Sequence, residues 1–105
     1  MPLTRRQQIG QILREGPIDV EDLARRVKAS VPTVLEDFAH VRRGLPGGEV
    51  WIQHAAECFA CGFCFRNRER FNTPSRCPEC RSEEIRPPEF EIASRAPSPQ
   101  RVESE

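Results

Sequence analysis

The sequence predicts an α+β protein: a three-helix helix-turn-helix unit of the winged kind, followed by a small β zinc ribbon. Three observations support this prediction. Apolar residues recur at helical spacing three times before residue 48, a short alternating segment follows at 49–54, and two Cys-x2-Cys pairs lie beyond it. We therefore expect a helix-turn-helix domain over 1–54, a four-cysteine zinc ribbon over 55–93 and a disordered tail over 94–105.

Each expected helix begins at a residue that can cap it. The cap residues are Thr4, Asp19 and Ser30, and Gln7 completes a capping box with Thr4. Gly16 ends the first helix, and the link between the second and third helices is short. This pattern favours a helix-turn-helix unit, and a plain three-helix bundle without a ligand is the alternative.

The segment EVWIQH at 49–54 alternates as a strand does. Val50 and Ile52 would lie on one face of that strand and Trp51 on the other. A strand directly after the third helix is what the winged variant of the unit has.

The spacing of the cysteines predicts a metal site. Cys58-x2-Cys61 and Cys77-x2-Cys80 are separated by fifteen residues, which is the spacing of four-cysteine structural zinc sites. Two residues between ligands let a tight turn present both sulfur atoms to one ion. Iron in a rubredoxin-like centre is the less favoured alternative, since four thiolates suit both metals. A closed site of four thiolates has no open position for substrate and is therefore structural.

The fifth cysteine, Cys64, is the expected surplus residue. Gly62 directly follows Cys61 and has the backbone freedom that a knuckle turn needs, whereas Cys64 is followed by Phe65. Strand alternation would place Phe63 and Phe65 on one face and Cys64 on the other. Cys64 would then be a small apolar filler, with a redox-sensing thiol or an alternative ligand as the competing interpretation.

Charge and composition narrow the class of protein. The chain has 16 Lys/Arg and 16 Asp/Glu, so it lacks the strong basic charge of many nucleic-acid binders. No apolar run is long enough to span a membrane and no signal-peptide pattern is present, so we expect a cytoplasmic protein. We expect no enzyme, because the chain offers no Ser/His/Asp set and no phosphate-binding glycine loop.

Basic residues gather around the cysteines. They are Arg66, Arg68, Arg70, Arg76, Arg81 and Arg86. These side chains could balance the negative charge of a zinc ion bound by four thiolates, or they could bind phosphate. Both interpretations stay open at this point.

The chain resembles the predicted archaeal transcriptional regulators in which a helix-turn-helix domain is fused to a zinc ribbon. The resemblance covers about residues 3 to 93 and is most specific in the second half, in Cys-x2-Cys-Gly-Phe-x-Phe, Pro-Ser-Arg-Cys-Pro-x-Cys and a final Pro-x-Phe strand. It implies DNA binding and transcriptional regulation, with metal ligands at Cys58, Cys61, Cys77 and Cys80. The third helix would then be the reading helix.

Subtracting the apolar stripe of the third helix leaves its candidate DNA-reading residues. They are Thr33, Glu36, Asp37, His40 and Arg43. Candidate contacts to the DNA backbone are Arg25, Arg26, Lys28, Arg42 and Arg43. Glu36 and Asp37 are unfavourable on a helix that reads DNA, because carboxylates repel phosphate. A carboxylate can, however, accept a hydrogen bond from cytosine.

Two other functions compete with DNA binding. The chain could be a protein–protein adaptor that docks on transcription or translation machinery, which the acidic third helix and the zero net charge favour. It could also bind RNA through the arginine-rich ribbon, with Phe71 as a stacking residue. A homodimer is compatible with the sequence, but the sequence contains no heptad pattern that would predict one.

Overall fold

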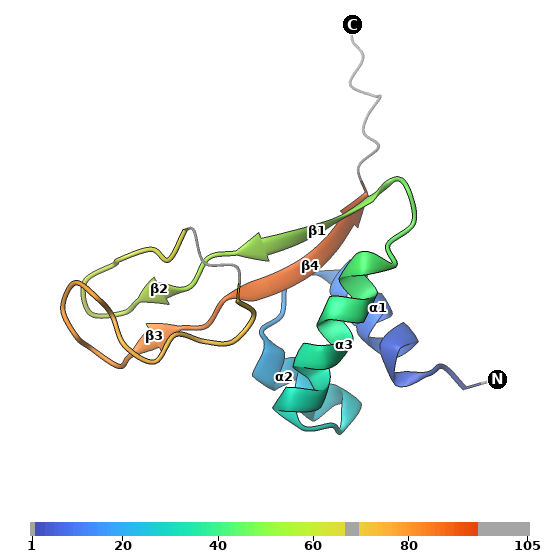
Figure 1. Ribbon diagram of the computed structural model, residues 1–105, viewed down its shortest axis with the longest axis horizontal. Coiled ribbons are helices and arrows are strands. Elements are labelled where there is room, and N and C mark those ends of the chain that lie inside the picture. Colours follow the sequence, from blue (N-terminus) through green and yellow to red (C-terminus); the bar gives the residue numbers. More distant parts are fainter. Residues whose placement is uncertain (1, 67–69, 95–105) are drawn as a thin grey trace, which may run out of the picture.

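The computed structural model describes residues 2–66 and 70–94, so the expected tail beyond Ser94 and the loop arginine Arg68 lie outside the described residues. Three helices come first: α1 (Arg5–Glu15), α2 (Val20–Val27) and α3 (Val31–Arg43). Four strands follow: β1 (Glu49–His54), β2 (Glu57–Cys58), β3 (Ile85–Arg86) and β4 (Glu89–Ser94). The helices pack at one end of the molecule, and β2 and β3 lie at the far end of the long β1–β4 ladder (Figure 1). The α+β class is as predicted.

The three predicted helix caps are confirmed. Thr4 Oγ1 accepts a hydrogen bond from the backbone of Gln7 at 3.1 Å, and the Gln7 side chain accepts one from the backbone of Thr4 at 2.9 Å. Asp19 and Ser30 cap α2 and α3 in the same manner, each accepting from the backbone three residues later. These bonds satisfy backbone N–H groups that a helix leaves unpaired at its start.

Strand β1 pairs with β4 rather than with a neighbour along the chain. The two strands are antiparallel, with Trp51 opposite Ile92 and His54 opposite Glu89. Trp51 and Ile92 face the helices, while Val50 and Ile52 lie on the other face, as the alternation predicted. Ile18, between α1 and α2, also bridges β4 through Phe90.

The zinc-ribbon segment is therefore inserted into the sheet of the helical unit. Residues 55–88 leave from the end of β1 and return at the start of β4 (Figure 1). We placed residues up to 93 in the ribbon from the sequence, but β4 packs against α1 and contributes Phe90 and Ile92 to the helical core. A domain boundary at residue 54 divides the chain in sequence, but β4, which comes after that boundary, packs with the helices that come before it.

Two separate cores hold these parts. The larger one joins the three helices to β4, and its centre is a group of aromatic rings: Phe38, Trp51, Phe71 and Phe90. The smaller core lies in the ribbon and consists of Ala56, Cys58, Cys77 and Ile85, flanked by Phe63 and Phe65. Among the helices in the described part of the chain, none is long and apolar enough to cross a membrane.

Candidate metal centre and the surface of α3

The four cysteines predicted as ligands come together in space. Their Sγ atoms all lie within 4.8 Å of one another, and two of the separations, Cys58 to Cys80 and Cys61 to Cys77, are 3.6 Å. A tetrahedral ion with metal–sulfur bonds of about 2.3 Å needs sulfur atoms about 3.8 Å apart. The group therefore has the size of a four-thiolate site and needs little adjustment to close on one ion.

Two matching knuckles present these sulfur atoms. In the first, the N–H of Gly62 donates to the carbonyl of Cys58 at 2.9 Å, and Gly62 has a φ of +80°. In the second, the N–H of Arg81 donates to the carbonyl of Cys77 at 2.9 Å, with a φ of +67°. The left-handed turn that we predicted at Gly62 thus recurs at Arg81, where no glycine marks it in the sequence.

Hydrogen bonds and burial separate the acidities of the thiols. Burial raises the pKa of Cys58, but the N–H groups of Cys61 and Ala60 outweigh it and bring that pKa down to about 7. The N–H of Phe63 lowers the pKa of Cys61, yet burial and the neighbouring thiols raise it to about 12. One thiolate thus forms readily near neutral pH. The pKa values of Cys61 and Cys80 are raised, so these two thiols need a nearby cation to ionise at the same pH, which is the electrostatic role of a bound metal.

Cys64 stands apart from this group. It is half-buried, pairs by a β-bridge with Glu57, and does not belong to the cluster of four sulfur atoms. Phe63 and Phe65 on either side of it pack edge to face, with ring centroids 5.0 Å apart. This placement agrees with the interpretation of Cys64 as a filler residue.

The arginines of the ribbon divide into paired and solvent-facing side chains. Arg76 lies 3.3 Å from Glu83, and Arg86 lies 3.3 Å from Glu57. Arg66, Arg70 and Arg81 are solvent-exposed. The ribbon is therefore a mixed-charge surface, with nearby carboxylates neutralising two of its described arginines.

The structure corrects one of the residues assigned to the reading face of α3. Asp37 is fully buried, and its carboxylate accepts hydrogen bonds from Arg5 and, at 2.9 Å, from Arg6. The hydrogen bond from Arg5 is the main reason that the pKa of Asp37 is held below its usual range. Helical spacing alone put Asp37 outside because it did not show that α1 covers this side of α3.

Other candidate DNA contacts do lie on the surface. Glu36, His40, Arg42 and Arg43 are exposed on α3, and Thr33 is half-buried beside its cap residue. Arg25, Arg26 and Lys28 are exposed on and after α2. Arg25 is ion-paired with Asp22 on its own helix, and Arg26 lies 3.7 Å from Glu15.

Arg5 and Arg6 are structural residues that the sequence interpretation missed. A signal for them exists: they occupy the first turn of α1, where the helix dipole disfavours cations and no acidic residue offsets them. Two cations in such a place need a carboxylate from elsewhere, and Asp37 supplies it.

Comparison with known proteins follows the same two-part division. A family model described as PF0610-like, N-terminal, matches residues 4–49. A second model, the PF0610 rubredoxin-like zinc beta-ribbon domain, matches residues 55–95. The solution NMR structure of protein PF0610 from Pyrococcus furiosus is 38% identical, with a TM-score of 0.67, over 84% of this chain and 87% of that one.

The chain belongs to the PF0610-like family. Its four-cysteine group is the site of one structural zinc ion, as the ribbon match and the sulfur geometry agree. A search among curated proteins finds no match. The family descriptions name a fold and a metal, and they name no activity.

Proposed function

We propose that this PF0610-like chain is a DNA-binding transcriptional regulator in which the zinc ribbon is structural. Three features support the proposal. α2 and α3 are joined by a short turn at Lys28–Ser30, as in helix-turn-helix units. The β1–β4 ladder follows α3 in the place of a wing. The four thiolates leave the metal no open coordination position, so we infer that it does no catalysis.

The burial of Asp37 is the observation that carries this proposal. From the sequence, two carboxylates on α3 opposed contact with phosphate. With Asp37 turned inward and neutralised, Glu36 is the remaining acidic residue on α3, against Arg42 and Arg43 in its last turn. The exposed side of α3 therefore has a net positive charge that the sequence alone did not reveal.

The test is binding of the zinc-loaded protein to genomic DNA fragments at several salt concentrations. We expect a saturable complex that weakens as salt rises. The double variant Arg42→Ala, Arg43→Ala should bind more weakly, and its salt slope should fall by about 2, roughly one unit for each lost phosphate contact. Arg76→Ala with Arg86→Ala is the matched control, since it removes the same charge from paired arginines of the ribbon. Equal losses in both double variants, or no complex at low salt, would contradict the proposal.

An adaptor function is the second candidate, and one observation favours it. Phe59, within the first zinc knuckle, is 67% exposed. A large apolar ring held outward by a rigid turn suits insertion into a pocket of a partner protein. The RNA alternative loses its named residue, because Phe71 packs in the aromatic core with its ring 5.4 Å from that of Phe38.

A further inference from the structure

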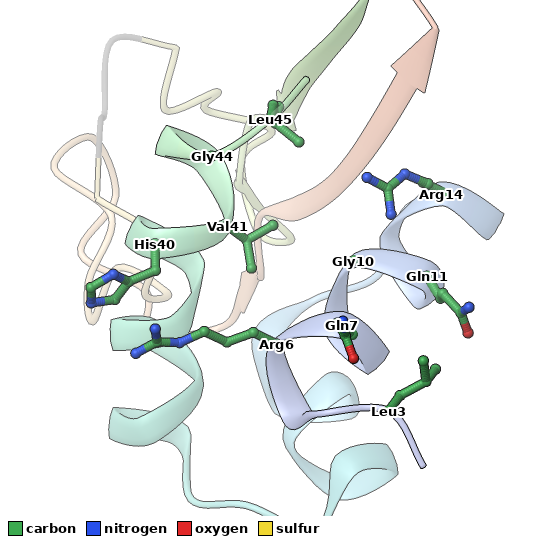
Figure 2. A pocket seen from close by; sticks show the side chains of 10 residues that line it. All are labelled: Leu3, Arg6, Gln7, Gly10, Gln11, Arg14, His40, Val41, Gly44 and Leu45. Carbon is green, nitrogen blue, oxygen red and sulfur yellow. The ribbon is translucent and has the colours of Figure 1, made fainter. Parts of the chain in front are cut away.

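A groove runs between α1 and the last turns of α3, on the side where Asp37 is covered. Its volume is about 560 Å³, within the range of small-molecule sites. Leu3, Val41 and Leu45 are its apolar side chains. Arg6 extends from α1 toward His40 on α3, and Arg14 lies farther along α1 (Figure 2). The groove therefore combines an apolar surface with cationic groups.

The charged side chains that line the groove are the arginines Arg6 and Arg14. Its lining residues include no aspartate and no glutamate, although the whole chain is neutral. Arg14 is neutralised by Glu49, to which it donates two hydrogen bonds of 2.8 and 2.7 Å. Arg6 is not neutralised to the same extent, because it shares the single carboxylate of Asp37 with Arg5. Glu36 lies close enough to Arg5 to raise its pKa as well, but neither Asp37 nor Glu36 lines the groove, whereas Arg6 does.

One of the residues that line the groove is a glycine inside a helix. Gly10 is buried in the middle of α1, where a glycine is unfavourable for helix stability. A methyl group added there would stand 3.1 Å from Arg14 Nη1, closer than most real contacts of this kind. The missing side chain at Gly10 therefore leaves room for the Arg14 guanidinium, which donates to Glu49.

We propose that this groove binds a small organic anion with an apolar body, such as an aromatic or aliphatic carboxylate. Arg6 would attract the anionic group, and Leu3, Val41 and Leu45 would contact the apolar part. His40 and Val41 belong to α3, so the ligand would touch the same helix that we propose as the DNA reader. Binding at the groove does not depend on that function and is tested without DNA.

The experiment is a titration of the zinc-loaded protein with 2-naphthoate, followed by the assigned backbone amide signals. We expect a dissociation constant on the order of 1 mM for about 13 non-hydrogen atoms in an open groove. The shifts should concentrate in the segments 6–11 and 40–45, which carry most of the residues that line the groove. The neutral analogue 2-naphthalenemethanol should bind more weakly.

Three matched charge variants of α1 complete the test. Gln7→Glu adds a carboxylate to the groove and keeps the capping box, in which glutamate serves as well as glutamine. It should weaken 2-naphthoate binding about threefold to fivefold, and adding Gln11→Glu should bring the loss to about tenfold. Gln8→Glu, exposed on the same helix but outside the groove, should change binding less than about twofold.

The proposal is overturned by any of three results. These are shifts spread over the whole surface, equal weakening by Gln7→Glu and Gln8→Glu, and equal binding of the neutral analogue. The last result would identify the groove as an apolar docking surface for a peptide or protein.

Discussion

Asp37 is a single residue whose environment reverses its expected role. It lies on α3 at a position that helical spacing assigns to solvent, and it is fully buried. The hydrogen bond from Arg5, with that from Arg6, holds its pKa below the usual value of 3.8. A carboxylate whose pKa is lower in the folded state stabilises the fold while it is ionised. Its contribution is therefore present above about pH 4 and is lost as the pH falls through the folded-state pKa.

The substitution Asp37→Asn tests this at the residue scale. We expect it to lower the free energy of unfolding by about 2 kcal/mol at pH 7, because two arginines lose their anionic partner while keeping partial access to water. The difference from the parent protein should shrink as the pH falls below about 4. Urea unfolding of both proteins at several pH values measures this difference in stability. The two proteins are compared at each pH because the affinity for zinc also falls as the pH is lowered.

Glu36→Gln is the control for that prediction. It removes the same charge from the neighbouring position on α3, where the side chain is exposed. Its effect should stay within about 0.5 kcal/mol at each pH. Equal stability of the two variants would show that Asp37 does not hold α1 to α3.

The aromatic core shows, at the scale of elements, how the ribbon segment supports the helices. Phe71 comes from the long loop between β2 and β3, yet its ring contacts those of Trp51 at 5.7 Å and Phe90 at 5.5 Å. The rings of Phe38 and Phe90 lie 5.0 Å apart at the centre of the cluster. α3, β1, β4 and this loop therefore share one packed core, although they are distant in sequence.

Phe71→Ala should lower the free energy of unfolding by about 2 kcal/mol, less than for a fully buried phenylalanine because this ring is half-buried. Chemical denaturation followed by Trp51 fluorescence reports on the affected cluster directly. Phe59→Ala removes the same side chain from a position that is 67% exposed and should change stability by less than about 0.5 kcal/mol. A similar loss in both variants would place the effect outside this core.

At the scale of the whole molecule, both ends of the ribbon segment that carries the metal site connect to the sheet of the helical unit. The ribbon leaves from β1 and returns through β4, and β4 packs on α1. The ribbon's own core is small, so the zinc ion supplies most of its stability, with roughly 10 kcal/mol or more for a site of this kind. Loss of zinc should therefore also weaken the pairing of β4 with β1.

Metal analysis and hydrogen exchange of two cysteine variants test this coupling. We expect about one zinc ion per chain in the parent protein and in Cys64→Ser. Cys77→Ser should lose the ion, because the Cys77 sulfur belongs to the group of four and is buried. It should also speed exchange of the β4 amides. Release of zinc by Cys64→Ser would show that the ligand assignment is wrong, and unchanged exchange in β4 would show that the two parts are independent.

Features set by short stretches of chain were predictable from the sequence. The caps at Thr4, Asp19 and Ser30 use partners three residues away, and each zinc knuckle closes within five residues. The alternation of β1 also indicated that Trp51 and Val50 face opposite sides. Local hydrogen bonding and side-chain periodicity determine all of these, and both are readable in the order of the residues.

The tertiary structure alone decided where the distant partners meet. Asp37 is buried because Arg5, 32 positions earlier, reaches it from another helix. β4 pairs with β1 across the entire ribbon, and Phe71 joins a core made by other elements. Burial of a charge or a ring depends on what covers it, and periodicity within one helix carries no record of the covering element. The sequence by itself thus determined the parts and the metal-binding pattern, and the packing determined which charges α3 presents to solvent.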